Sequence, residues 1–134
     1  MAKKKVITKI GADILKELSI EVQSDHQQVC LGAIERLGMI ENPKATVILL
    51  GVLKDPRFMI RIHAAAQLGT RQDKKSVDAL IETLRDKSLF VRQTAASALE
   101  NIGGTKAKKA VKMAEKDGRL LDELPEGRRL IQKK

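Results

Sequence analysis

Two sets of basic residues recur every 31 residues along the chain, and their side chains could bind an anionic partner. One set is Lys44, Lys75 and Lys106, and the other is Lys54, Arg85 and Lys116. Ammonium and guanidinium groups form strong hydrogen-bonded ion pairs with carboxylates and phosphates. If each period is one structural unit, residues at equal positions line up in rows along the molecule. The pattern therefore predicts an anion-binding surface.

No set of residues predicts catalysis or a metal site. Cys30 is the only cysteine, which excludes an intramolecular disulfide and favours a small buried apolar role. His26 and His63 occupy different positions in the period, and neither has the adjacent glutamate of a His-Glu iron site. The Gly-Gly-Thr-Lys run at 103–106 lacks the first glycine of a phosphate loop, so we expect a turn and a helix start there. We expect no catalytic residue, no bound metal and no cofactor.

Composition narrows the classes of partner. The 134 residues include 26 Lys and Arg against 17 Asp and Glu, a formal net charge of +9 that favours an acidic protein, a nucleic acid or a lipid headgroup layer. Tryptophan and tyrosine are absent, so most of the stacking platforms of single-strand binders are missing. No apolar stretch approaches the roughly 18 residues of a membrane span. Residues 1–10 lack the apolar core of a signal peptide, and we therefore expect a cytoplasmic protein.

The elements that must position the cations are predicted by the same period. Apolar residues at helical spacing recur in three sets: Val29, Ala33 and Leu37; Ile60, Ala64 and Leu68; Val91, Ala95 and Leu99. Such spacing indicates an amphipathic helix, and proline or glycine residues mark the connections. Each period is then a helix, a short polar connection and a second helix. Stacked helix pairs of this kind form an all-α solenoid.

The period also sets the expected boundaries. Lys112 and Glu115 replace apolar residues of the preceding repeat, as a polar terminal face requires, so the regular stack should end near Asp117. The predicted organisation is a basic segment at 1–10, a capping helix at 11–23, repeats at 24–54, 55–85 and 86–116 that complete a repeat domain of 11–117, and a C-terminal helix or tail at 118–134.

The segment 55–69 begins Asp-Pro-Arg-Phe-Met-Ile-Arg and ends His-Ala-Ala-Ala-Gln-Leu-Gly, and a similar pattern returns at 86–99. This pattern resembles the short HEAT-like repeats of phycobilin lyases. The resemblance implies a right-handed α-solenoid of about three helix-pair repeats with an N-terminal capping helix. It also implies that the second helices line a concave surface.

The resemblance further implies a polar ladder between neighbouring repeats. In that family the Asp at the start of a repeat and the Arg six residues later form it, which here would join Asp55 with Arg61 and Asp86 with Arg92. A shielded carboxylate-guanidinium pair suits this structural role. The first repeat has serine and cysteine at these positions, so we expect it at an end of the ladder.

The two cationic rows carry different weight as binding candidates. Ten residues of helix separate them, which is about 15 Å, wide enough for a backbone or an acidic helix. Cations at a helix C-terminus are favoured by the helix dipole, so the row that begins at Lys54 has a structural explanation. Cations at a helix N-terminus are disfavoured by the same dipole, so the row that begins at Lys44 is the better functional candidate. The predicted partner-binding residues are Lys44, Arg71, Lys74, Lys75, Lys106, Lys108, Lys109 and Lys112.

Three functions remain open from the sequence. The resemblance favours a non-enzymatic scaffold or adaptor whose basic groove binds an acidic protein or protein complex. Electrostatic binding of nucleic acid or of the ribosome through the lysine rows is the alternative. An accessory subunit of a lyase-type enzyme is implied by fold analogy alone.

Overall fold

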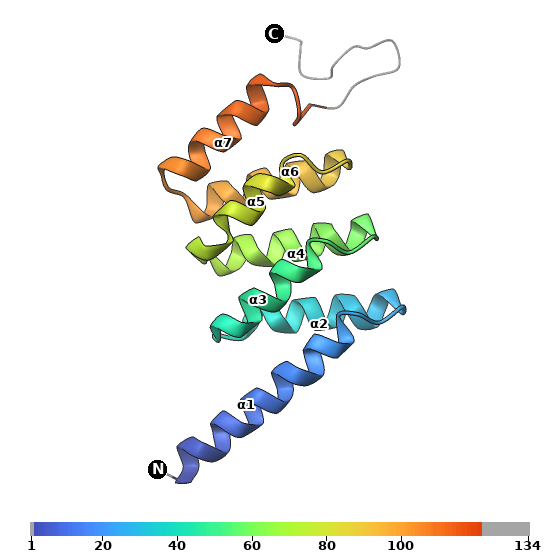
Figure 1. Cartoon of the computed structure of the whole chain (residues 1–134), viewed down its shortest axis with the longest axis vertical. Coiled ribbons are helices and arrows are strands. Elements are labelled where there is room, and N and C mark those ends of the chain that lie inside the picture. Colours follow the sequence, from blue (N-terminus) through green and yellow to red (C-terminus); the bar gives the residue numbers. More distant parts are fainter. Residues whose placement is uncertain (1, 122–134) are drawn as a thin grey trace.

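The structure is a computed structural model that describes the backbone of residues 2–121 and the side chains of residues 11–121. Every regular element in this part of the chain is helical, which confirms the predicted all-α class (Figure 1). The elements are α1 (Ala2–Glu21), α2 (Gln27–Met39), α3 (Pro43–Val52), α4 (Phe58–Arg71), a 3-10 turn η1 (Lys74–Ser76), α5 (Val77–Thr83), α6 (Leu89–Ile102) and α7 (Thr105–Lys116).

The helices keep the 31-residue period. The first helices α2, α4 and α6 begin at residues 27, 58 and 89, and the second elements α3, η1 and α7 begin at residues 43, 74 and 105. Figure 1 shows α2, α4 and α6 stacked side by side, with α3 and α5 crossing in front of them. The molecule is therefore a short α-solenoid in which each period adds one helix to each of two layers.

Local sequence explains where the second helices begin. Asn42 and Asp73 each accept a hydrogen bond at 2.9 Å from the backbone N–H two residues later, which satisfies one of the free donors of a helix N-terminus. One period further on the position is Gly104, with φ 97°, and Gly103 before it has φ 78°. These backbone conformations favour glycine. The run at 103–106 is thus a connection and a helix start, as its sequence predicted.

The core runs along the stack between the two layers. Leu37, Leu68 and Leu99 hold the same register position in α2, α4 and α6, and all three are fully buried. Val29, in contrast, is 43% exposed although its counterparts Ile60 and Val91 are buried. Within residues 2–121, no first helix precedes α2, so this position lacks the neighbour that covers it in later repeats.

Small residues let the first helices approach closely. A Cβ atom on Gly69 of α4 would lie 2.7 Å from the Cα of Ala98 in α6, so no larger residue fits without movement. One period earlier, a Cβ on Gly38 would meet Gln67. Of the three consecutive alanines at 64–66, the first two are buried but Ala66 is exposed, because it lies on the outer side of α4.

The ends of the stack differ from expectation. The basic segment predicted at 1–10 is not separate from the cap, because α1 is continuous from Ala2 and Gly11 does not interrupt it. At the other end α7 is followed by a turn at 117–120, and Leu120 packs against the core. The part of the predicted C-terminal helix or tail beyond residue 121 lies outside the described residues.

Candidate functional site

The solvent-facing positions of the three second helices form a regular array, here called the second-helix face. Within each period the positions follow one another by three, four and three residues, which is the spacing of one side of a helix. All twelve residues are exposed: Lys44, Val47, Gly51 and Lys54; Lys75, Asp78, Glu82 and Arg85; Lys106, Lys109, Met113 and Lys116. Seven of the twelve carry a positive charge, so the predicted rows lie on one exposed face.

Two ion pairs cross the centre of the second-helix face. Lys106 Nζ lies 2.6 Å from Asp78 Oδ1, and Lys54 Nζ lies 3.4 Å from Glu82 Oε1. All four side chains are at least 70% exposed, so water and salt screen both pairs and each contributes little stability. The face therefore consists of two cationic rows with a central strip that contains two carboxylates. The sequence predicted the two rows but not the carboxylates between them.

Arg71 is a structural residue, which corrects its predicted role in partner binding. Its Nε donates to Thr46 Oγ1 at 2.9 Å, Nη1 donates to the Leu37 carbonyl at 2.9 Å and Nη2 donates to the Asn42 carbonyl at 3.2 Å. Carbonyls at and beyond a helix C-terminus lack intrahelical partners, and the Arg71 guanidinium supplies hydrogen-bond donors to those of α2. The other two repeats have isoleucine at this register position, which is the signal that Arg71 does not belong to a cationic row.

Lys108 and Lys112 lie at the open C-terminal end of the stack. They occupy the positions of Val77 and Ile81, which are half-buried in the preceding repeat. Together with Glu100, Thr105, Lys109, Val111 and Glu115 they line a hollow of about 750 Å³. The described residues form no further repeat at this end, and polar residues here replace the apolar ones of the preceding repeat. Of the remaining predicted residues, Lys74 is exposed beside Lys75 at the edge of the second-helix face.

The polar ladder joins one repeat to the next. Arg61 is 5% exposed, and its Nε and Nη2 donate to the two carboxylate oxygens of Asp86, each at 2.9 Å. Asp55, in the same repeat as Arg61, accepts only through its backbone carbonyl, to which Arg61 Nη1 donates at 2.9 Å. The predicted pairing of Asp55 with Arg61 is therefore wrong. The carboxylate comes from the following repeat, whose first turn lies directly over the guanidinium.

At the upper end of the ladder, the arginine has no carboxylate partner among the residues that the structure describes. Arg92 donates from Nη1 to the Asp86 carbonyl at 2.8 Å and from Nε to the Arg119 carbonyl at 2.7 Å. The predicted pairing of Asp86 with Arg92 is thus also wrong. The next aspartate in register, Asp117, pairs instead with Arg119 at 3.0 Å.

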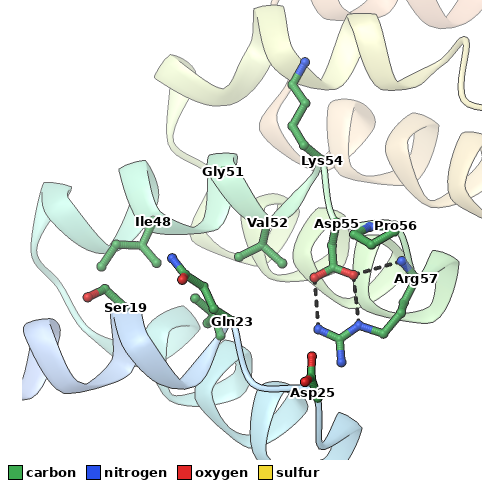
Figure 2. Close-up of a pocket in the computed structure, with 11 residues that line it drawn as sticks. Ser19, Gln23, Asp25, Ile48, Gly51, Val52, Lys54, Asp55, Pro56 and Arg57 are labelled. Carbon is green, nitrogen blue, oxygen red and sulfur yellow. Dashed lines mark hydrogen bonds and ion pairs between the residues drawn. The ribbon is translucent and has the colours of Figure 1, made fainter.

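The lower end of the ladder is closed by Arg57, two residues after Asp55. The Arg57 Nε and Nη2 donate to the two carboxylate oxygens of Asp55, each at 3.0 Å (Figure 2). The Arg57 Nη1 donates to the Ser24 carbonyl at 3.0 Å. Arg57 reaches the first repeat, where Cys30 stands in place of the ladder arginine. Arg57 and Arg119 are absent from the predicted sites. The Asp-x-Arg pattern that they share, two periods apart, is the signal that could have identified them.

A pocket of about 590 Å³ lies beside this ion pair, between the end of α1, the end of α3 and the turn into α4 (Figure 2). It is lined by Ser19, Val22, Gln23, Asp25, Ile48, Gly51, Val52, Lys54, Asp55, Pro56 and Arg57. Cys30 behind it is buried, which raises the pKa of its thiol, and its Sγ donates to the Val22 carbonyl at 3.1 Å. The lining mixes apolar and charged groups, and the thiol next to it is kept protonated.

Three carboxyl groups have pKa values below their ordinary range. The Arg57 side chain lowers the pKa of Asp55, and a backbone hydrogen bond at the start of η1 lowers the pKa of Asp73. Burial raises the pKa of Asp86, but the hydrogen bonds from Arg61 and from one backbone N–H, together with the Arg61 charge, outweigh it and lower that pKa. All three groups are therefore ionised at neutral pH.

These carboxyls predict a loss of stability in acid. A carboxyl with a lower pKa in the folded than in the unfolded chain stabilises the fold above its unfolded pKa, and the contribution is lost as pH falls through the folded pKa. We expect the urea midpoint to be nearly constant from about pH 8 to about pH 5 and to fall below about pH 4. Removal of one such carboxyl, in Asp86→Ala, should reduce the drop. An identical pH profile for that variant would contradict the role of Asp86.

Within the described residues, no three or more His, Cys, Asp or Glu side chains gather into a group that could hold a metal ion. His26 is the exposed residue before α2, and His63 is half-buried in α4. None of the described helices has the length and hydropathy to cross a bilayer.

The chain matches a model of a known protein family. Residues 48–121, from the second helix of the first repeat to the turn after α7, match the family model of HEAT repeats. The match covers more than half of the chain. No curated protein matches the chain significantly.

Proposed function

Because the chain belongs to the HEAT-repeat family, we propose that it is a non-enzymatic interaction scaffold whose second-helix face binds an acidic segment of a partner protein. HEAT repeats are generally protein-interaction scaffolds. The observation that supports this particular surface is the exposed array in which both ends of every second helix carry a cation. The surface is formed by packed helices before the partner arrives, so little conformational entropy is lost on binding.

The central strip favours a protein over a nucleic acid. Asp78 and Glu82 place two carboxylates between the cationic rows, where a continuous phosphate backbone would meet like charge. Val47 and Met113, both more than half exposed, add apolar contacts to the same strip. A protein segment can place carboxylates over the two rows and neutral or basic side chains over the strip. The rows are about 15 Å apart, and a helix with its side chains is about 10 Å across, so an acidic helix fits between them.

Charge reversal on the N-terminal row tests the proposal. Lys44 and Lys75 are exposed, and neither forms an ion pair with another described residue, so Lys44→Glu with Lys75→Glu should leave helical content and melting temperature unchanged. Partner capture from native lysate treated with nuclease should fall about tenfold or more, because each reversal replaces an attraction by a repulsion. Lys106 is left intact because it pairs with Asp78.

The matched control carries the same change in net charge elsewhere. Arg36→Glu with Lys87→Glu alters two exposed cations outside the second-helix face and should retain capture. Equal capture by both double variants would exclude this face. Loss of all capture with nuclease would instead indicate nucleic-acid binding. In that case about six phosphate contacts should give a slope of log affinity against log salt of about −5 on duplex DNA.

A further inference from the structure

A second exposed feature lies between α4 and α6, on the layer of first helices. It is a groove of about 560 Å³, here called the first-helix groove, and all the described residues that line it belong to these two helices. Phe58 and Phe90, the two aromatic residues of the chain, lie in it and are 46% and 62% exposed. Met59 and Ile62 complete the apolar part, and the other lining residues are neutral and polar. Large apolar side chains are thus left in water at one place.

Among the described residues, none that lines the first-helix groove is charged, although 32% of the residues of the chain are charged. The two arginines of α4 do not reach it, because Arg61 is buried in the polar ladder and Arg71 caps α2. This lining is the opposite of the second-helix face in electrostatic character. A partner that presents charge to the groove would lose hydration without gaining an ion pair, so complementarity requires an uncharged apolar contact surface.

The size and the walls of the groove indicate what kind of partner fits. Seven of the described residues line it, whereas a stable interface between two proteins uses about 20–30 residues on each side. A short segment is therefore a better fit than a permanent second copy of the chain. The walls offer no strand edge, so an extended segment would leave backbone N–H and C=O groups unpaired against apolar side chains. A helix satisfies these groups itself and packs between two helices that already lie side by side.

We propose that the first-helix groove binds one amphipathic helix of a partner protein through an uncharged apolar face, with Phe58 and Phe90 as the anchors. Large aromatic side chains dominate the binding energy of such interfaces. This site is separate from the second-helix face and does not depend on it. The scaffold then has two docking surfaces of different chemistry, one for acidic segments and one for apolar helices.

A synthetic peptide tests the proposal on the full chain. The probe is a fluorescent helical peptide of about four turns, with leucine at positions i, i+3, i+4 and i+7 and glutamine elsewhere. Fluorescence anisotropy should show saturable binding that is equal in low and in high salt, because no charges meet. Phe90→Gln should weaken binding by about tenfold or more. Met39→Gln, at an apolar residue that is 79% exposed outside the groove, should not change it.

Four results would overturn the proposal. The first is equal affinity of the peptide for the protein and for Phe90→Gln. The second is loss of binding in Lys44→Glu with Lys75→Glu, which would place the peptide on the second-helix face. The third is a dimer in sedimentation that Phe90→Gln converts to a monomer, which would identify a second copy as the occupant. The fourth is binding only to the full chain with Leu130→Gln and Ile131→Gln, which would identify the C-terminal segment of the chain itself.

Discussion

Asp86→Ala is expected to lower the free energy of unfolding by about 3 kcal/mol, measured by urea denaturation at neutral pH. The reason is the guanidinium left behind. Arg61 is 5% exposed and donates two hydrogen bonds to the Asp86 carboxylate, so its loss leaves a buried charge with only backbone carbonyls as partners. We place the effect at the lower end for a broken buried pair because those carbonyls remain.

Asp78→Ala is the matched control, because it removes the same group from an ion pair at the surface. The Asp78 side chain is 80% exposed, and surface pairs contribute less than about 1 kcal/mol. A second test adds Arg61→Met to Asp86→Ala. The double variant should be no less stable than the single one, because the unpaired charge is gone. Equal losses of stability in Asp86→Ala and Asp78→Ala would show that the buried pair of Arg61 with Asp86 stabilises the contact between repeats no more than a surface pair does.

Leu68→Ala is expected to lower the free energy of unfolding by roughly 2 to 5 kcal/mol, again by urea denaturation. Leu68 is fully buried in α4 at the centre of the stack, where repeats contact it on both sides. Close packing by α2 and α6 limits how far the site can collapse, so a cavity remains. A loss of this size would be a large part of the stability of a small domain.

The control for Leu68→Ala is Val47→Ala on the second-helix face. Val47 is 66% exposed, so its truncation removes little buried surface and should change stability by less than about 0.5 kcal/mol. A small effect at Leu68 would mean that the 31-residue register does not define the core. Unchanged binding together with reduced stability would separate the core from the docking surfaces.

Much of the fold follows from the sequence because the period is strict. Helix starts are predicted by apolar residues at helical spacing, by proline at 43 and by glycine at 103–104. The structure places the starts of the second elements at residues 43, 74 and 105, at intervals of one period. The apolar stripe also predicts that its leucines are buried. These features depend on local spacing, which a single sequence contains in full. The exposure of the two cationic rows follows in the same way, because positions opposite the apolar stripe must face solvent.

The partners of individual polar groups do not follow from local spacing. Asp55 and Arg61 are close in sequence, yet Arg61 pairs with the aspartate of the next repeat, 25 residues away. Arg71 looks like a surface cation but caps the end of α2, which lies one repeat earlier. Both contacts depend on how far one repeat is rotated and shifted against the next.

The sequence alone determined the class of fold, the period, the buried leucines at 37, 68 and 99 and the cationic rows, because each of these depends on contacts within one helix pair or on repetition. The tertiary structure alone decided which carboxylate meets which arginine, that Arg57 closes the lower end of the ladder, and that Phe58 and Phe90 share a groove. Phe58 and Phe90 occupy different register positions, so the period does not bring them together. Only the packing of α4 against α6 does, since side-chain direction and helix crossing set which residues meet across repeats.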